Sequence, residues 1–172
     1  VSGEAAMVGT IDRADDTVPA KYVYGITFKD IAFRYTSYLD PHTEGWVEIQ
    51  ACFTAKDFPP RLFTRYKAEV AVTFDYAQGA RVDGCSFTAF SATALDFGEG
   101  VSGSTICNNN FQGIGGTAIQ VGNVNSRDAQ PFSPTFYKDD VTKVENSDPD
   151  PWRITKNILV FSNRINDIGT QF

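Results

Sequence analysis

Apolar and polar residues alternate in three short stretches between residues 70 and 122, and the three stretches resemble one another. They cover residues 71–74, 94–97 and 118–121, which lie 23 and then 24 residues apart. Alternation predicts β-strands, because successive side chains of a strand point to opposite faces. A second set recurs with two apolar residues five positions apart: Val82 and Phe87, Ile106 and Phe111, Val160 and Ile165. Repetition at such a period predicts stacked units that bury their apolar faces against their neighbours.

Glycine, asparagine and serine cluster between these strands, as in residues 98–104 and 113–117. Such clusters mark turns, since Gly and Asn tolerate left-handed backbone angles. A chain that turns several times per repeat forms parallel sheets, and connections between parallel strands of one sheet are almost always right-handed. The pattern therefore predicts an all-β fold, a right-handed parallel β-helix with rungs of about 23–24 residues. The alternative is a β-sandwich in which the matching strands are unrelated.

The alternate apolar positions of the repeated strands are expected to stack inside the coil: Val72, Phe74, Leu95, Phe97, Ile119 and Val121. Residues 22–33 resume the alternation and predict the first clear rung. Residues 1–20 predict a loop or an incomplete rung. The expected organisation is a single β-helix domain over residues 1–172, forming part of a longer β-helix.

Two long segments break the period and are predicted to be loop insertions, near residues 35–67 and 123–155. The first is rich in aromatic residues, and long loops on a repeat protein often carry its binding face. The second is rich in Asp and Glu. A calcium site and a solvated acidic loop are alternatives for it, although no twelve-residue calcium-loop pattern occurs.

Composition narrows the range of partners. With 15 basic and 21 acidic residues the net charge is −6, which offers no general attraction to nucleic acids or anionic membranes. No run of about 18 apolar residues is present to cross a bilayer. We therefore expect neither a nucleic-acid nor a membrane partner. No cofactor and no metal are expected either, and the oligomeric state is left open.

The three cysteines, Cys52, Cys85 and Cys107, form no paired framework. Cys85 and Cys107 fall on adjacent rungs at different offsets. Two separate thiols are therefore favoured over a disulfide between them.

Two aspartates fit the geometry of glycoside hydrolysis, which usually needs two carboxyl groups across the scissile bond. If the alternate apolar residues point inward, Asp75, Asp96 and Gln120 point outward from one sheet. Rung spacing of about 4.8 Å and about 6.6 Å along the strand place the carboxylates of Asp75 and Asp96 roughly 8 Å apart. That falls in the range of ~6.5–9.5 Å found in inverting enzymes. The alternative is two surface aspartates on a polar face.

Six segments carry a resemblance to a known family: TFKDIAF (27–33), EGWVEIQA (44–51), DGCSF (83–87), NNNF (108–111), GGTAIQVG (115–122) and INDIG (165–169). Together they resemble secreted bacterial right-handed β-helix proteins, and more narrowly glycoside hydrolase family 141. The resemblance implies xylanase or α-L-fucosidase activity on plant cell-wall polysaccharide such as xylan or fucosylated pectin. It also implies a secreted, periplasmic or cell-surface location. Members of the family are longer, so further rungs are expected after residue 169, and Asp167 resembles an Asp of a family rung.

The candidate catalytic residues are Asp96, Asp75 and Asp167, and the candidate substrate-binding residues are Trp46, Glu48, His42 and Gln120. Trp46 offers an aromatic face for stacking on a sugar, or it packs its loop onto the coil. Two other functions stay open. One is a polysaccharide lyase that uses the basic cluster of Arg61, Arg65 and Lys67. The other is a non-catalytic β-helix that serves sugar binding or adhesion.

Overall fold

The computed structural model describes residues 6–8, 22–37, 53–56, 64–67, 70–122 and 154–169; ranges 6–8, 53–56 and 64–67 are described as strands alone. All the regular secondary structure in these residues is β-strand, which confirms the predicted all-β class. The strands are β1 (Ala6–Val8), β2 (Val23–Tyr24), β3 (Thr27–Lys29), β4 (Ala32–Thr36), β5 (Phe53–Lys56), β6 (Thr64–Lys67), β7 (Val70–Phe74), β8 (Ala77–Gln78), β9 (Arg81–Asp83), β10 (Ser86–Phe90), β11 (Thr93–Phe97), β12 (Thr105–Cys107), β13 (Asn110–Ile114), β14 (Ile119–Val121), β15 (Leu159–Phe161) and β16 (Arg164–Ile168).

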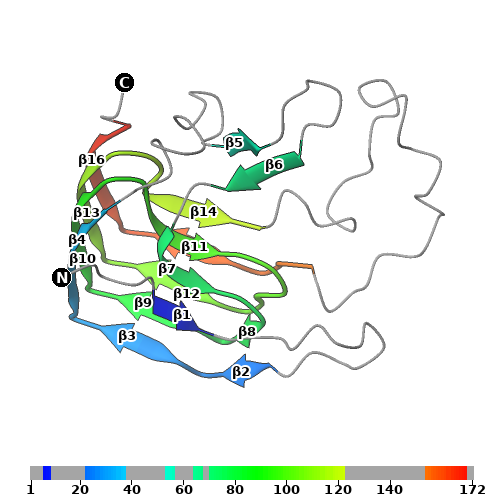
Figure 1. Cartoon of the computed structure of the whole chain (residues 1–172). Helices are drawn as coiled ribbons and strands as arrows, with labels where there is room; N and C mark the ends of the chain where they lie inside the picture. The colour runs from blue at the N-terminus through cyan, green and yellow to red at the C-terminus, as the bar shows by residue number, and fades with distance from the viewer. Residues whose placement is uncertain are drawn as a thin grey trace.

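The described strands form four parallel sheets and one antiparallel pair, β5 with β6, and each parallel sheet is named after one of its strands (Figure 1). The β9 sheet has the order β3-β9-β12-β15, the β10 sheet β4-β10-β13-β16, and the β11 sheet β1-β7-β11-β14. The β8 sheet pairs β2 with β8 and continues through bridges from Gln78 to Ser102 and from Ser102 to Lys156. From β2 onwards the chain enters the β8, β9, β10 and β11 sheets in that order and then returns to the β8 sheet. One passage through the four sheets is termed a circuit. Because the repeated strands pair with one another in parallel, the alternative of unrelated matching strands is excluded.

Apolar columns run through successive circuits and form the interior. Phe87 is the register partner of both Phe33 and Phe111, and its ring stacks on theirs with centroids 4.9 and 4.7 Å apart. This spacing matches the ~4.8 Å between neighbouring strands. Each ring therefore lies directly over the next, and the repeated five-residue offset from Val82 to Phe87 marks two such columns in adjacent sheets.

The β11 sheet contains the inward stack predicted from the repeat. Its buried members are Val72, Phe74, Leu95 and Phe97. Ile119 pairs with Leu95 and is only half-buried, whereas Val121 pairs with Phe97 and is 49% exposed. Both belong to β14, the edge strand of the sheet, so no described strand packs beyond them. The register places both side chains on the inward face, as predicted, and their exposure follows from the edge position of β14.

Three columns of residues with left-handed backbone angles form the turns between strands. The columns are Gly25, Gly79, Gly103 and Asn157; Asp30, Gly84, Asn108 and Ser162; and Tyr35, Ala89, Gly113 and Asp167. Within a circuit the three residues follow one another at intervals of five, so the chain bends before β9 or its equivalent, before β10 or its equivalent, and again within the strands of the β10 sheet. A residue other than glycine pays roughly 1–2 kcal/mol for this conformation. Seven of the twelve positions are not glycine, so the pairing on both sides must offset that cost.

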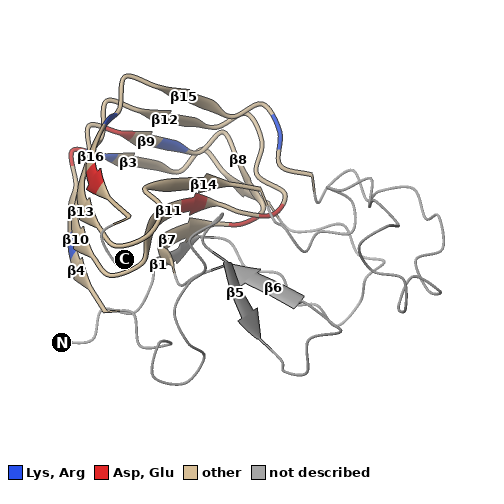
Figure 2. Cartoon of the chain, turned by 90° about the horizontal axis from the view of Figure 1, so that it is seen from above, with Lys and Arg blue, Asp and Glu red and all other residues tan. Residues whose placement is uncertain are grey.

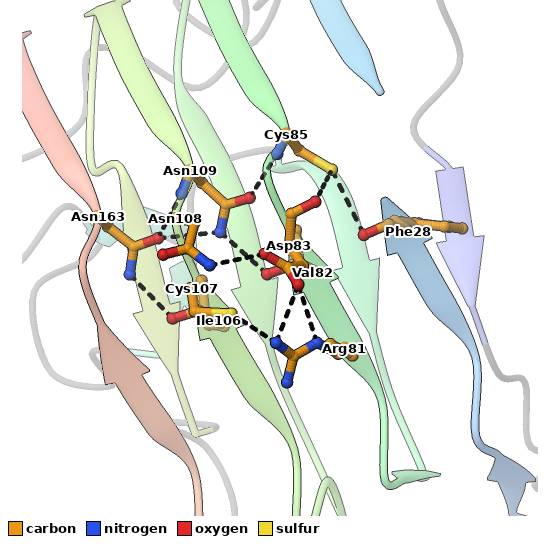
Figure 3. A network of polar contacts seen from close by, with 10 residues as sticks. All are labelled: Phe28, Arg81, Val82, Asp83, Cys85, Ile106, Cys107, Asn108, Asn109 and Asn163. Carbon is orange, nitrogen blue, oxygen red and sulfur yellow. Dashed lines mark hydrogen bonds and ion pairs between the residues drawn. The ribbon is translucent and has the colours of Figure 1, made fainter. Parts of the chain in front are cut away.

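Buried side-chain amides tie successive circuits together at the turn between the β9 and β10 sheets (Figure 3). Asn109 is 2% exposed; its Oδ1 accepts from the backbone N–H of Cys85 at 2.8 Å and its Nδ2 donates to the carbonyl of Val82 at 3.0 Å. Asn163 repeats the arrangement one circuit later, where its Oδ1 accepts from the N–H of Asn109 at 3.0 Å and its Nδ2 donates to the carbonyl of Ile106 at 2.9 Å. The ladder satisfies backbone groups that burial would otherwise leave unpaired.

Along the chain, one long insertion precedes β7 of the β11 sheet and the other follows β14 of the same sheet. Residues 38–69 connect β4 to β7, and residues 123–153 connect β14 to the last circuit. The predicted first insertion needs two corrections. Tyr35 still belongs to β4, and the segment contains the antiparallel pair of β5 and β6 instead of loop alone. The acidic residues considered for calcium lie outside the described residues.

For residues 1–20 the sequence predicts either a loop or an incomplete rung, and the described strand β1 favours the second. β1 pairs in parallel with β7 and adds an edge strand to the β11 sheet. An incomplete rung therefore describes this segment better than a loop.

We expect Ala89→Gly to stabilise the protein, because Ala89 has a φ of 59° and glycine adopts that angle without steric cost. The gain should be up to about 1 kcal/mol. Ala32 is a matched control, since it is also exposed in the β10 sheet but has no left-handed angle. Ala32→Gly should cost about 0.5–1 kcal/mol. Urea unfolding measures both, and an equal loss for the two variants would contradict the role of the turn columns.

Candidate functional site

Acidic side chains gather where the chain leaves the β11 sheet for the β8 sheet. Asp75 and Tyr76 follow β7, Glu99 follows β11 one circuit later, and Asp96 lies within β11. Figure 2 shows the acidic positions in β11 and in the turns beyond β7 and β11. These four residues are termed the acid corner.

Hydrogen bonds from three circuits hold the acid corner. The Tyr76 hydroxyl donates to Oε1 of Glu99 at 2.6 Å, and the backbone N–H of Glu99 donates to Oδ1 of Asp75 at 2.7 Å. The N–H of Tyr76 donates to the carbonyl of Glu99 at 2.7 Å. From the next circuit, the Thr155 hydroxyl donates to the carbonyl of Gly98. The corner is therefore fixed by both its backbone and its side chains.

Gly98 leaves room for two carboxylates. A Cβ atom added at Gly98 would collide with Oδ1 of Asp75 and would lie 3.3 Å from Oδ2 of Asp96. The two oxygens are therefore less than about 6.6 Å apart, twice the longer of these distances. The separation of roughly 8 Å calculated from ideal strand spacing is too long for these oxygens. Asp75 lies beyond the end of β7, and its side chain turns over Gly98.

The acid corner is buried. Asp96 and Glu99 are each 3% exposed, whereas Asp75 is half-buried. Gln120 is the register partner of Asp96, and its buried Oε1 finds no hydrogen-bond partner in the described part of the chain. Asp96 and Gln120 occupy the outward side of the β11 sheet, as alternation predicts. The alternative of an open polar surface is wrong for Asp96, because this side of the strand is covered.

A second polar cluster lies on the outer side of the β9 sheet (Figure 3). Arg81 donates to Oδ2 of Asp83 through Nε at 3.1 Å and Nη2 at 2.9 Å, and Nδ2 of Asn108 donates to Oδ1 of Asp83 at 2.8 Å. The hydrogen bonds from Asn108 and Arg81 lower the pKa of Asp83 to about 2. Burial, followed by the hydrogen bond with Asp83, raises the pKa of Cys107. A reactive cysteine needs the opposite shift, so this cluster stabilises the sheet and does not build a nucleophile.

The cysteine prediction is confirmed where the structure describes it. Cys85 and Cys107 are separate, buried thiols. Cys52 lies outside the described residues.

The other candidates from the sequence do not join the acid corner. Asp167 is exposed in β16, which belongs to the β10 sheet. Outside the described residues lie Trp46, Glu48 and His42, together with the side chains of the basic cluster Arg61, Arg65 and Lys67. Of the sequence candidates, the structure brings together Asp75, Asp96 and Gln120.

Sequence reasoning missed Glu99 and Tyr76. The signal for Glu99 is the repeat itself, since Glu99 follows Asp75 by 24 residues. The offset of 24 residues between Val82 and Ile106 leads from Asp75 to Glu99, whereas the offset of 23 between Phe74 and Phe97 leads to Gly98.

The described residues contain no group of three His, Cys, Asp or Glu side chains arranged to hold a metal ion. They also contain no helix long and apolar enough to cross a membrane. Comparison with known proteins gives no match to any family model, curated protein or solved structure. The resemblance to glycoside hydrolase family 141 therefore rests on the six sequence segments alone.

We expect Asp83→Asn to reduce stability at neutral pH and to have little effect in strong acid. The folded-state pKa of Asp83 is lowered from 3.8 to about 2, so its ionised form stabilises the fold above pH 3.8 and this contribution is lost as the pH falls towards 2. Thermal unfolding of both proteins between pH 7 and pH 2 measures the difference. A difference in melting temperature that stays constant over this range would contradict the assigned pKa.

Proposed function

We propose that the four parallel sheets are the sides of a right-handed parallel β-helix. Two observations support this proposal. The chain enters the sheets in the same order in each circuit, and left-handed residues turn it at three positions, five residues apart, in each circuit. The right-handed sense follows from the general preference of connections between parallel strands.

The function that this geometry supports best is hydrolysis of a glycosidic bond, with Asp75 and Asp96 as the two carboxyl groups. The observation that carries the proposal is their convergence at Gly98, with oxygens less than about 6.6 Å apart. Retaining glycosidases hold their carboxyl groups ~5–5.5 Å apart, whereas inverting enzymes leave ~6.5–9.5 Å for a water molecule. The upper limit reaches only the lower edge of the inverting range, so the proposal favours a retaining enzyme.

In a retaining mechanism one carboxylate attacks the anomeric carbon while the other carboxyl group donates a proton to the departing oxygen. The former proton donor, now a carboxylate, then takes a proton from water, which attacks the anomeric carbon and releases the sugar and the nucleophilic carboxylate. The half-buried Asp75 is the more accessible group and suits the nucleophile. Asp96 is 3% exposed, so its use as the proton donor requires the outer side of the β11 sheet to open when the polysaccharide binds.

The resemblance to glycoside hydrolase family 141 supplies the proposed substrate class. Plant cell-wall polysaccharides such as xylan and fucosylated pectin are the proposed substrates, and the proposed location is secreted, periplasmic or at the cell surface. Trp46, Glu48 and His42 stay candidate substrate-binding residues, and Asp167 stays a candidate catalytic residue on another sheet. No cofactor is part of the proposal.

A non-catalytic sugar-binding β-helix is the second candidate function. The burial of Asp96 favours it, and so does the use of Oδ1 of Asp75 as an acceptor for the backbone of Glu99. In that case the hydrogen bonds of the acid corner stabilise the contact between two circuits, and its carboxylates have no catalytic role.

Release of reducing sugar from xylan and fucosylated pectin by the purified protein separates the two functions. If Asp75 and Asp96 are catalytic, Asp75→Asn and Asp96→Asn should each lower the rate by about 10²–10⁴-fold. Gly98→Ala should also lower it, because the added methyl group displaces the Asp75 carboxylate while the acid itself is kept.

Asp83→Asn is the matched control, since Asp83 is an acid on a different sheet, and it should keep the wild-type rate at pH 7. Circular dichroism confirms that each variant is folded. Hydrolysis by Asp75→Asn and Asp96→Asn at the wild-type rate would contradict the catalytic role of the pair. Tight binding of either polysaccharide without hydrolysis would support the second candidate.

A further inference from the structure

Three tyrosines lead from the surface of the β8 sheet to the acid corner. Tyr24 is 68% exposed, and its ring centroid lies 6.3 Å from that of Tyr22. The ring of Tyr22 lies 6.4 Å from that of Tyr76 in an edge-on contact. The Tyr76 hydroxyl donates to Glu99 at 2.6 Å. An exposed aromatic ring is thus connected to the buried carboxylates through consecutive side-chain contacts.

A polar row continues from Tyr24 along the outer side of the same sheet. Tyr24 is the register partner of Gln78, and bridges extend this position to Ser102 and Lys156. The alternation of the strands places these side chains outward, since the preceding residues Ala77 and Val101 are fully buried. The row therefore offers one aromatic ring, an amide, a hydroxyl and an ammonium group, one circuit apart from each other.

We propose that Tyr24, supported by Tyr22, is a subsite that stacks on a pyranose ring of a polysaccharide lying across the circuits of the β8 sheet. This inference rests on the proposed function, and it adds where the polymer lies and which chemistry binds it. A tyrosine ring gives a sugar a large apolar contact surface at a low cost in side-chain entropy, and its hydroxyl stays in water. Gln78 and Ser102 would then bond to the sugar hydroxyl groups of the next units.

The composition of the row favours a sugar over a protein partner. A protein interface needs a fully buried apolar centre of many residues, whereas this row has a single exposed aromatic ring among polar groups. A sugar presents hydroxyl groups on its edges and an apolar face, which matches the row. The contacts through Tyr22 and Tyr76 link the row to Glu99, whose backbone N–H donates to Asp75 of the proposed carboxyl pair.

Tyr24→Ala tests the subsite, with Tyr35→Ala as the matched control. Tyr35 is also a highly exposed tyrosine of the first circuit (73%), but it lies in the β10 sheet. Its left-handed position is occupied by Ala89 in the next circuit, so alanine is tolerated there. Calorimetric titration with xylo-oligosaccharides and with fucosylated pectin fragments gives the affinities. Tyr24→Ala should weaken binding by roughly fivefold to tenfold, and Tyr35→Ala should leave it unchanged.

The outcomes separate this inference from the proposed function. Unchanged affinity in Tyr24→Ala, or an equal loss in Tyr35→Ala, would overturn the proposed subsite. Hydrolysis by the wild-type protein in the same experiments would still support the proposed glycoside hydrolase function. Failure of the wild-type protein to bind any of these oligosaccharides would overturn both. If the protein hydrolyses the polymer, Tyr24→Ala should raise KM with little change in kcat, because the subsite lies outside the reacting bond.

Discussion

The need to turn through a left-handed conformation at three positions of each circuit, five residues apart, is the constraint on which the described structure depends. Such a turn is easy for glycine and costly for other residues, yet Asp30, Tyr35 and Ala89 adopt it. Ladder hydrogen bonds to the neighbouring circuits and stacked rings such as Phe87 on Phe111 offset the cost. The constraint makes the strands short, and it brings equivalent residues of successive circuits into register.

The candidate site lies where this regularity is interrupted. Phe74 pairs with Phe97, an offset of 23 residues, whereas Gln78 pairs with Ser102, an offset of 24. One residue is therefore gained beyond β11, at the turn that contains Gly98 and Glu99. The extra residue lets the Asp75 carboxylate lie over Gly98 and accept from the backbone of Glu99. Both long insertions also adjoin strands of the β11 sheet along the chain, since residues 38–69 precede β7 and residues 123–153 follow β14.

The repeat made much of the fold predictable, because one period fixes register, parallel pairing and the inward columns together. Leu95 and Phe97 are buried as the alternation predicts. Alternation gives only the side of a sheet, however, and cannot say what covers that side. The burial of Asp96 and the exposure of Val121 depend on contacts beyond the strand and were therefore missed. Glu99 and Tyr76 lie in a turn, where the period-two pattern carries no information, although the 24-residue offset from Asp75 would have located Glu99.

The central claim is that the acid corner and the tyrosines beside it form one polysaccharide site. A crystal structure of an Asp96→Asn variant with a bound cell-wall oligosaccharide tests this claim most directly. We expect a sugar ring stacked on Tyr24 and a glycosidic bond between Asp75 and residue 96, with the outer side of the β11 sheet opened. An oligosaccharide bound on another sheet, with the acid corner still covered, would contradict it.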